Sequence, residues 1–252
     1  MHMNAARQSG TVADIPSREP DLVAVLHSAA NALQDRDVEA YARIRQFVKT
    51  GMHGDRTEFI RQFTAYYRLN RAGLTQVFKD TYFQLLFDHR PNRSGDPYTP
   101  VLLRLHEIPR RQGDRILAAS FTSKLVAVHD EAQPLYDRFV AAFFGITVPT
   151  FGTLEFRISG FVRNLMVIKS RYESWSQMPD IAEILERIRQ RHPGIARAHP
   201  VRICDFLVWT AGKNARNVRP LRGQMVADAM SDDFPAAPMP TSAGKTSPDR
   251  DE

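Results

Sequence analysis

Two side chains in this sequence have types and positions suited to covalent chemistry, Lys124 and Asp137. Lys124 lies at the beginning of an apolar stretch with Phe121, Leu125 and Val128, and Asp137 follows a proline-containing turn. A lysine amine is a nucleophile only when deprotonated, and burial among apolar side chains lowers its pKa. A nearby carboxylate can stabilise a developing positive charge and help deprotonate the amine. The pair therefore predicts an amine nucleophile assisted by an acidic residue.

Each of these residues also has a purely structural interpretation. A lysine on an amphipathic helix commonly lays its carbon chain over apolar neighbours, and Lys124 fits that pattern. Asp137 fits the N-cap position of a helix, where such a residue contributes about 1 kcal/mol. The sequence leaves these interpretations open beside the catalytic one.

The elements that would position the two residues are helical. Apolar residues recur at helical spacing along most of the chain, and only Gly145–Phe151 is a weak candidate for a strand. Asp88–Pro100 is rich in turn-forming residues. The sequence predicts an all-α fold class, with one compact multi-helix domain or two lobes. The predicted helices are Asp21–Gln34, Asp37–Val48, Thr57–Leu69, Thr75–Phe87, Pro100–Ile108, Asp114–Val128, Leu135–Phe144, Leu154–Ser174, Ile181–Arg191 and Val201–Ala211.

Both ends of the chain lack this periodicity. The first residues mix Gly, Ser, Arg and Pro, and the last combine Pro, Ser, Ala and acidic residues. Such segments bury too little apolar surface to offset the entropy lost on folding. We therefore predict a disordered tail over residues 1–19, a helical domain over residues 20–227 and a disordered tail over residues 228–252.

The composition excludes several classes of protein. A chain of 252 residues with 43% hydrophobic and 25% charged residues is ordinary for a globular protein, and is not collagen, a disulfide scaffold or a wholly disordered chain. Cys204 is the single cysteine, which excludes an intrachain disulfide and a cysteine-based zinc site. Glycine-rich nucleotide motifs, HExxH and GxSxG are absent. We expect no metal or other cofactor. No apolar run approaches the roughly 20 residues that span a bilayer, so we expect no membrane partner and a cytoplasmic location.

The chain is basic, with a formal charge of +6 and a pI of about 9.7. This excess is compatible with a polyanionic partner such as nucleic acid but does not require one. Acidic residues gather in the last tail, so the folded part is more basic than the whole chain. Each candidate for a phosphate contact fits a solvated surface equally well. These candidates are Arg90, Arg93, Arg110, Arg111, Arg115, Arg138, Lys213 and Arg216.

The segment SFTSKLVAVHDEAQPLYDRF resembles the catalytic segment of the helix-hairpin-helix DNA glycosylases, particularly the 8-oxoguanine type with lyase activity. In that family a lysine begins the second helix of the hairpin, and an aspartate begins a later helix after a proline-containing turn. Lys124 and Asp137 match these positions. The stretches YYRLNRAGLTQVFKDTYFQLL and RICDFLVW are similar to a bacterial group that shares the SK…P-x-YD core. This chain differs in having no glycine-rich turn before the lysine, where Ser120–Thr122 stand, and a shorter lysine–aspartate spacing.

The resemblance implies a DNA glycosylase, with or without lyase activity, that acts on a base flipped out of double-stranded DNA. Lys124 would attack the sugar carbon that bears the base and then form a Schiff base. Asp137 would stabilise the positive charge on the sugar, and Tyr136 would contact the substrate. Two alternatives remain open, a non-catalytic nucleic-acid-binding module and a helical interaction protein whose basic surface is incidental. Salt-sensitive DNA binding that is indifferent to both residues would favour the first alternative, and an absence of DNA binding the second.

Three other features bear on the site. Tyr66–Arg68 and Asn70 could contact an extruded base, although aromatic residues at this spacing more often belong to a core. Arg202 and Asp205 are spaced to pair on one face of a helix, which we interpret as a structural clamp. Trp175 is predicted to be a packing residue.

Overall fold

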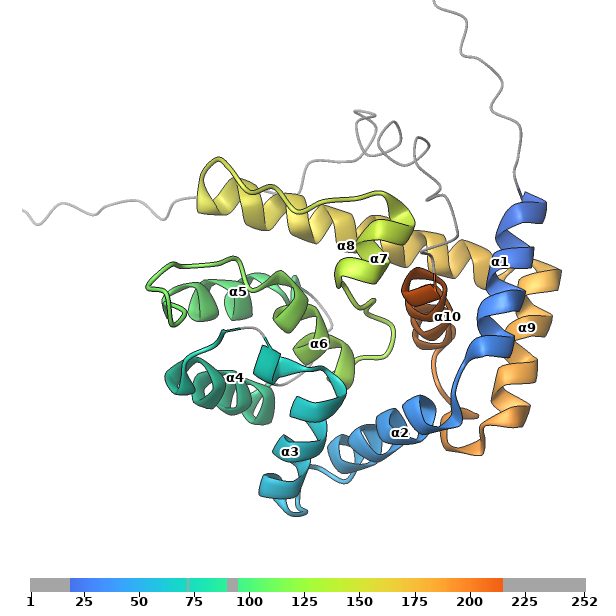
Figure 1. The fold of residues 1–252 in the computed structure, drawn as a ribbon, viewed down its shortest axis with the longest axis horizontal. Helices are drawn as coiled ribbons and strands as arrows, with labels where there is room; N and C mark the ends of the chain where they lie inside the picture. Colours follow the sequence, from blue (N-terminus) through green and yellow to red (C-terminus); the bar gives the residue numbers. More distant parts are fainter. Residues whose placement is uncertain (1–18, 72, 90–94, 215–252) are drawn as a thin grey trace, which may run out of the picture.

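In the computed structural model, the described part of the chain comprises residues 19–71, 73–89 and 95–214 (Figure 1). This part contains ten α-helices, two short 3₁₀ turns and no strand, which confirms the predicted all-α fold class. Both predicted tails, apart from residue 19, and residues 215–227 of the predicted domain lie outside it. The helices are α1 (Glu19–Ala32), α2 (Asp35–Lys49), α3 (Arg56–Tyr66), α4 (Gln76–Asp88), α5 (Thr99–His106), α6 (Ala119–His129), α7 (Arg138–Phe144), α8 (Leu154–Ser176), α9 (Pro179–Arg191) and α10 (Pro200–Asn214). The 3₁₀ turns are η1 (Leu69–Arg71) and η2 (Pro193–Ile195).

Helix α10 lies at the centre of the arrangement. Figure 1 shows α3 to α6 grouped on one side of the molecule and α1 and α9 on the other, with α7 and α10 between them and α8 running across the top from one group to the other. Helix α10 packs against α7, α1, α8 and α9, and every side chain from Val201 to Val208 is buried. Helix α10 is therefore part of the hydrophobic core, with other helices packed around it.

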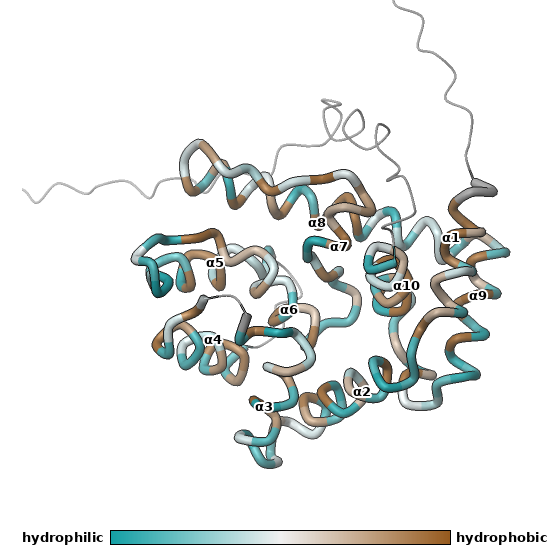
Figure 2. Tube along the Cα trace, viewed as in Figure 1, coloured by the Kyte–Doolittle hydropathy of each residue, from teal (hydrophilic) through white to brown (hydrophobic). Residues whose placement is uncertain are grey.

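The outer helices are amphipathic, as their apolar spacing predicts. In α9 the buried residues Ile181, Ile184, Leu185 and Ile188 recur at intervals of three and four, which places them on one face. Figure 2 shows hydrophilic and hydrophobic residues alternating along α4 and α9 in this manner. None of the described helices is long and apolar enough to cross a bilayer.

The structure corrects the start of one predicted helix and the one strand candidate. The helix expected from Asp114 begins only at Ala119, because a turn closed by hydrogen bonds from Gly113 N to Arg110 O (2.9 Å) and from Arg110 N to Asp114 O (2.9 Å) occupies the preceding residues. The weak strand candidate at Gly145–Phe151 is wrong. Gly145 ends α7 in the left-handed conformation, and the segment after it leads to α8 without pairing with any described strand.

Helices α7 and α10 approach each other closely at Gly212. A Cβ atom at this position would lie 2.7 Å from the Phe139 carbonyl oxygen and 3.0 Å from its Cβ. The backbone of α7 cannot yield as a flexible side chain would, so the contact requires glycine.

We expect Gly212→Ala to destabilise the protein. Alanine is favoured over glycine within a helix by about 1 kcal/mol, but overpacking against the α7 backbone costs typically about 1–3 kcal/mol. Urea denaturation followed by circular dichroism should show a lower free energy of unfolding for this variant. The exposed Asn214→Ala on the same helix serves as the control. A gain in stability for Gly212→Ala would contradict the close packing.

Candidate active site

Lys124 lies within the most deeply buried helix of its half of the molecule. Every residue of α6 from Thr122 to Val128 is buried, and 9% of the Lys124 surface remains exposed. The Lys124 amine donates a hydrogen bond to Ser120 Oγ (2.8 Å), one helical turn earlier. The amine also lies 5.6 Å from the centre of the Phe121 ring and 5.8 Å from that of Tyr67. A cation is thus held among aromatic faces with one polar partner.

This environment changes the acidity of the amine. Burial disfavours the charged form and lowers the pKa of Lys124 from 10.5 to about 8, and the negative charge of Asp137 partly opposes the change. A substantial fraction of the amine is consequently neutral at slightly alkaline pH. The chemistry expected of a nucleophilic lysine is therefore available to this side chain.

Asp137 occupies the N-cap of α7, as its sequence position indicated. Its Oδ1 atom accepts hydrogen bonds from Phe139 N (2.8 Å) and Val140 N (3.0 Å). Both bonds use the same oxygen, and Oδ2 has no hydrogen-bond donor among the described residues. The cap anchors the carboxylate while one of its oxygens stays available to another group.

Lys124 and Asp137 are brought together without forming a direct ion pair within the described residues. The negative charge of Asp137 acts on the Lys124 amine and raises its pKa, against the larger effect of burial. Their relative position is fixed by Ser123, whose buried Oγ accepts a hydrogen bond from Tyr136 N (3.0 Å) and donates to Tyr136 O (3.2 Å). The residue next to Lys124 is therefore bonded to the residue next to Asp137.

The clamp predicted on α10 is confirmed and holds the turn between α6 and α7. Arg202 and Asp205 are 1% and 2% exposed and pair at 2.6 Å. Asp205 accepts hydrogen bonds from Leu135 N (3.1 and 3.2 Å), and Arg202 donates to Gln133 O (2.9 Å) and Ala127 O (3.2 Å). Burial raises the pKa of Asp205 to about 7 although Arg202 opposes this change.

Tyr67, at the end of α3, and Phe121 form an aromatic wall beside the Lys124 amine. Tyr66 and Tyr67 contact each other edge to face with their centres 4.7 Å apart. Burial raises the pKa of Tyr67 to about 12, and its hydroxyl has no hydrogen-bond partner among the described residues. Arg68 is exposed and has a φ of 55°, in the left-handed region. Asn70 Oδ1 accepts a hydrogen bond from Lys79 (2.8 Å).

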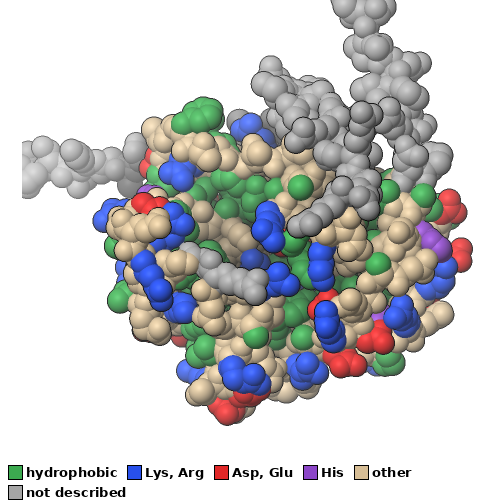
Figure 3. All heavy atoms as spheres, in the orientation of Figure 1, with side chains coloured by type: hydrophobic (Ala, Val, Ile, Leu, Met, Phe, Trp, Pro, Cys, Tyr) green, Lys and Arg blue, Asp and Glu red, His purple; other side chains and the backbone are tan. Residues whose placement is uncertain are grey.

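Two of the residues predicted to contact DNA lie on α7 and α10, which pack against each other beside the candidate site. Arg138 follows Asp137 directly and is exposed, with its guanidinium 4.6 Å from the centre of the Phe139 ring. Lys213 is exposed at the end of α10, with its amine 4.8 Å from the Trp209 ring. On the face drawn in Figure 3, several Lys and Arg side chains lie around a central hollow that contains hydrophobic side chains.

The other described residues predicted to contact DNA or substrate do not lie on these two helices. Tyr136 is buried and packs edge to face on Phe161 (5.5 Å), so its ring belongs to the core. Arg110 pairs with Asp114, and Arg111 Nε donates to Leu74 O (3.2 Å). Arg115 is exposed in the segment before α6. Arg90, Arg93 and Arg216 lie outside the described residues. Trp175 is buried and stacks on Phe144 (5.6 Å), which confirms its packing role.

Two serines that orient the site, Ser120 and Ser123, were not predicted from the sequence. Ser120 precedes Lys124 by one helical turn, a spacing that could have indicated the hydrogen bond. The pairing of Ser123 with Tyr136 has no comparable signal, because it joins two different elements. Among the described residues, no group of three His, Cys, Asp or Glu side chains could hold a metal ion.

Comparisons with protein-family models, curated proteins and solved structures give no significant match for this chain. The site must therefore be interpreted from its own geometry.

We expect Asp205→Ala to destabilise the protein strongly. The substitution leaves the Arg202 guanidinium buried without its counter-charge and Leu135 N without its acceptor, and loss of one partner of a buried pair costs about 3–5 kcal/mol. Urea denaturation measures the free energy of unfolding. The control is Glu107→Ala, which breaks the exposed pair with Arg104. A loss no larger than that of the control would show that the clamp does not hold the turn.

Proposed function

We propose that this chain is a DNA glycosylase with lyase activity, in which Lys124 is the nucleophile and Asp137 its acidic partner. The observation that supports this most strongly is the buried amine with a pKa of about 8 beside a carboxylate that retains a free oxygen. The likeness of the segment from Ser120 to Asp137 to glycosylase sequences gives the substrate class.

The proposed reaction begins with the neutral amine of Lys124. Its nitrogen bonds to the sugar carbon that carries the base, and the bond from that carbon to the base breaks. The base leaves with the bonding electrons and takes up a proton. The nitrogen loses a proton, the bond from the sugar carbon to the ring oxygen breaks, and the ring oxygen takes up a proton, which gives a protonated Schiff base. Loss of a proton from the sugar carbon next to the Schiff base would then expel the 3′ phosphate and cut the strand.

Asp137 would act electrostatically in this reaction. Positive charge grows on the sugar as the base departs, and a fixed carboxylate stabilises it more effectively than mobile water does. The hydrogen bonds from Phe139 N and Val140 N hold the Asp137 carboxylate in position before the substrate arrives. The free Oδ2 atom would face the sugar and receive the proton from the amine.

The surroundings of Lys124 suit an extruded nucleotide. The rings of Tyr67 and Phe121 lie beside the amine and offer apolar faces on which a base could stack. Arg138 and Lys213 are exposed on the adjoining helices, where they could contact backbone phosphates. Because 9% of Lys124 is exposed, the aromatic wall would have to open as the nucleotide is inserted.

Borohydride trapping on duplex oligonucleotides tests the proposal. The wild-type protein should form a covalent adduct with a duplex that carries 8-oxoguanine or an abasic site, and Lys124→Ala should form none. Lys169→Ala removes a half-buried lysine from α8 and should trap normally. The rate of trapping should rise with pH and level off above about 8, as the amine becomes neutral.

The Asp137→Asn variant separates the role of Asp137 in base departure from the role of Lys124 in forming the adduct. Base excision should fall by roughly 10²–10³-fold, whereas trapping on a ready-made abasic site should persist, because no base departs in that case. Equal trapping by Lys124→Ala and the wild type would contradict the proposal. Salt-sensitive DNA binding without any adduct across a panel of modified bases would instead support the binding module.

A further inference from the structure

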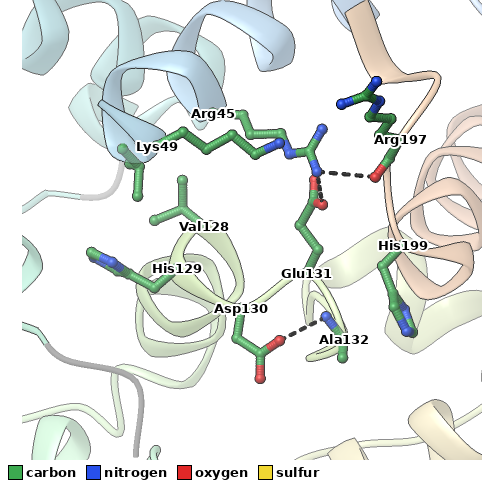
Figure 4. A pocket seen from close by; sticks show the side chains of 10 residues that line it. Arg45, Lys49, Val128, His129, Asp130, Glu131, Ala132, Arg197 and His199 are labelled. Atoms are coloured by element: carbon green, nitrogen blue, oxygen red, sulfur yellow. Dashed lines mark hydrogen bonds and ion pairs between the residues drawn. The ribbon is translucent and has the colours of Figure 1, made fainter. Parts of the chain in front are cut away.

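Two adjoining pockets lie at the junction of α2, the end of α6 and the segment that joins α9 to α10. Their volumes are about 540 Å³ and about 190 Å³. Both are lined by Arg45, Lys49 and Arg197, so the two pockets share these three side chains. Figure 4 shows them in the larger pocket. Lys124 lines neither pocket, so they are separate from the candidate active site.

The smaller pocket is positively charged. Besides the three shared cations, it is lined by Gln46 and small or apolar residues, and none of its lining residues is acidic. Its volume is large enough for a phosphate group. Cations that converge on a small concave site without a carboxylate attract an anion.

Arg45 is a buried arginine, and one of its N–H groups has no hydrogen-bond acceptor among the described residues. It is 9% exposed, pairs with Glu131 and donates to Arg197 O (3.2 Å), as Figure 4 shows. Glu131 also accepts a hydrogen bond from Tyr41 (2.8 Å), so its two oxygens are both engaged. Arg45 Nε has no acceptor among the described residues. Arg45 therefore contributes a fixed positive charge to the pocket wall, and Glu131 offsets part of that charge.

The other two cations carry charges that the described residues do not neutralise. Lys49, in the last turn of α2, and Arg197 are both exposed, and neither forms an ion pair within the described part of the chain. Two such cations beside a fixed guanidinium can donate charge-assisted hydrogen bonds to several oxygens of one phosphate.

The larger pocket has a different character. Val128, His129 and His199 contribute an apolar side chain and two flat rings. Asp130 also lines it and accepts hydrogen bonds from Ala132 N (3.0 Å) and Gln133 Nε2 (3.0 Å). Its carboxylate would repel a phosphate there but could accept a hydrogen bond from a hydroxyl or amino group. Its volume falls within the range of about 300–1,000 Å³ that is usual for small-molecule sites.

We propose that the two pockets together bind a small phosphate-bearing molecule of mononucleotide size. The phosphate lies in the smaller pocket between Lys49 and Arg197, beside the Arg45 side chain. The sugar and ring occupy the larger pocket, where Asp130 accepts a hydrogen bond from a hydroxyl or amino group. This site does not depend on the proposed glycosylase activity, because neither Lys124 nor Asp137 lines either pocket.

Isothermal titration calorimetry of the full chain with AMP, ribose 5-phosphate, inorganic phosphate and adenosine tests the proposal. AMP should bind saturably, ribose 5-phosphate and phosphate more weakly, and adenosine should not bind measurably. The double variant Lys49→Gln/Arg197→Gln should bind AMP at least about tenfold more weakly, because two charge-assisted hydrogen bonds are lost. Both substitutions are at exposed positions, and an unchanged urea transition verifies that the variant is folded.

The matched control is Arg43→Gln/Arg104→Gln, which removes the same charge from exposed positions elsewhere. It should bind AMP as the wild type does. The proposal is overturned if the wild type binds none of the phosphate-bearing probes, or if both double variants lose affinity equally. It is also overturned if Lys49→Gln/Arg197→Gln weakens binding of a DNA duplex while AMP binds to neither protein, since these cations would then contact a DNA backbone.

Discussion

The buried ion pair between Arg202 and Asp205 is the interaction on which the candidate active site depends. Neither group could remain charged in the core alone, and each is also bonded to the turn between α6 and α7. That turn leads directly to Asp137. Because α10 is fixed in the core, the ion pair holds the turn, and the turn positions the Asp137 carboxylate at the start of α7. The hydrogen bond from Tyr136 N to Ser123 Oγ then joins this segment to α6, the helix that carries Lys124.

The turn between α6 and α7 is held at both of its ends. Near its beginning, Glu131 is bonded to Arg45 and Tyr41 on α2, and near its end Leu135 is bonded to Asp205 on α10. The first attachment forms a wall of the larger pocket, and the second supports the candidate active site. One short segment thus borders both of the sites proposed for this protein. Its rigidity follows from charged groups contributed by two helices distant in the sequence.

Much of the helical scaffold could be predicted from apolar spacing, and so could contacts within one helix. The pairing of Arg202 with Asp205 at i, i+3 and the N-cap at Asp137 are both local and were both indicated. What the sequence could not indicate were contacts between elements, such as Leu135 N with Asp205 or Arg45 with Glu131, because no local pattern encodes which helices meet. For the same reason the sequence could not show that α8 covers Tyr136 with Phe161, so the substrate contact implied for Tyr136 was not separated from a core position.

The central claim is that burial beside Asp137 leaves Lys124 with an unusually acidic amine. The most direct test is to follow the ¹³Cε resonance of Lys124 by NMR as the pH is raised, with Lys124→Arg used to assign the signal. The account predicts a pKa of about 8 for the wild-type protein, and a still lower pKa in Asp137→Asn, where the neighbouring negative charge is gone. A midpoint near 10.5, unchanged by the substitution, would show that the amine is an ordinary solvated lysine and would contradict the account.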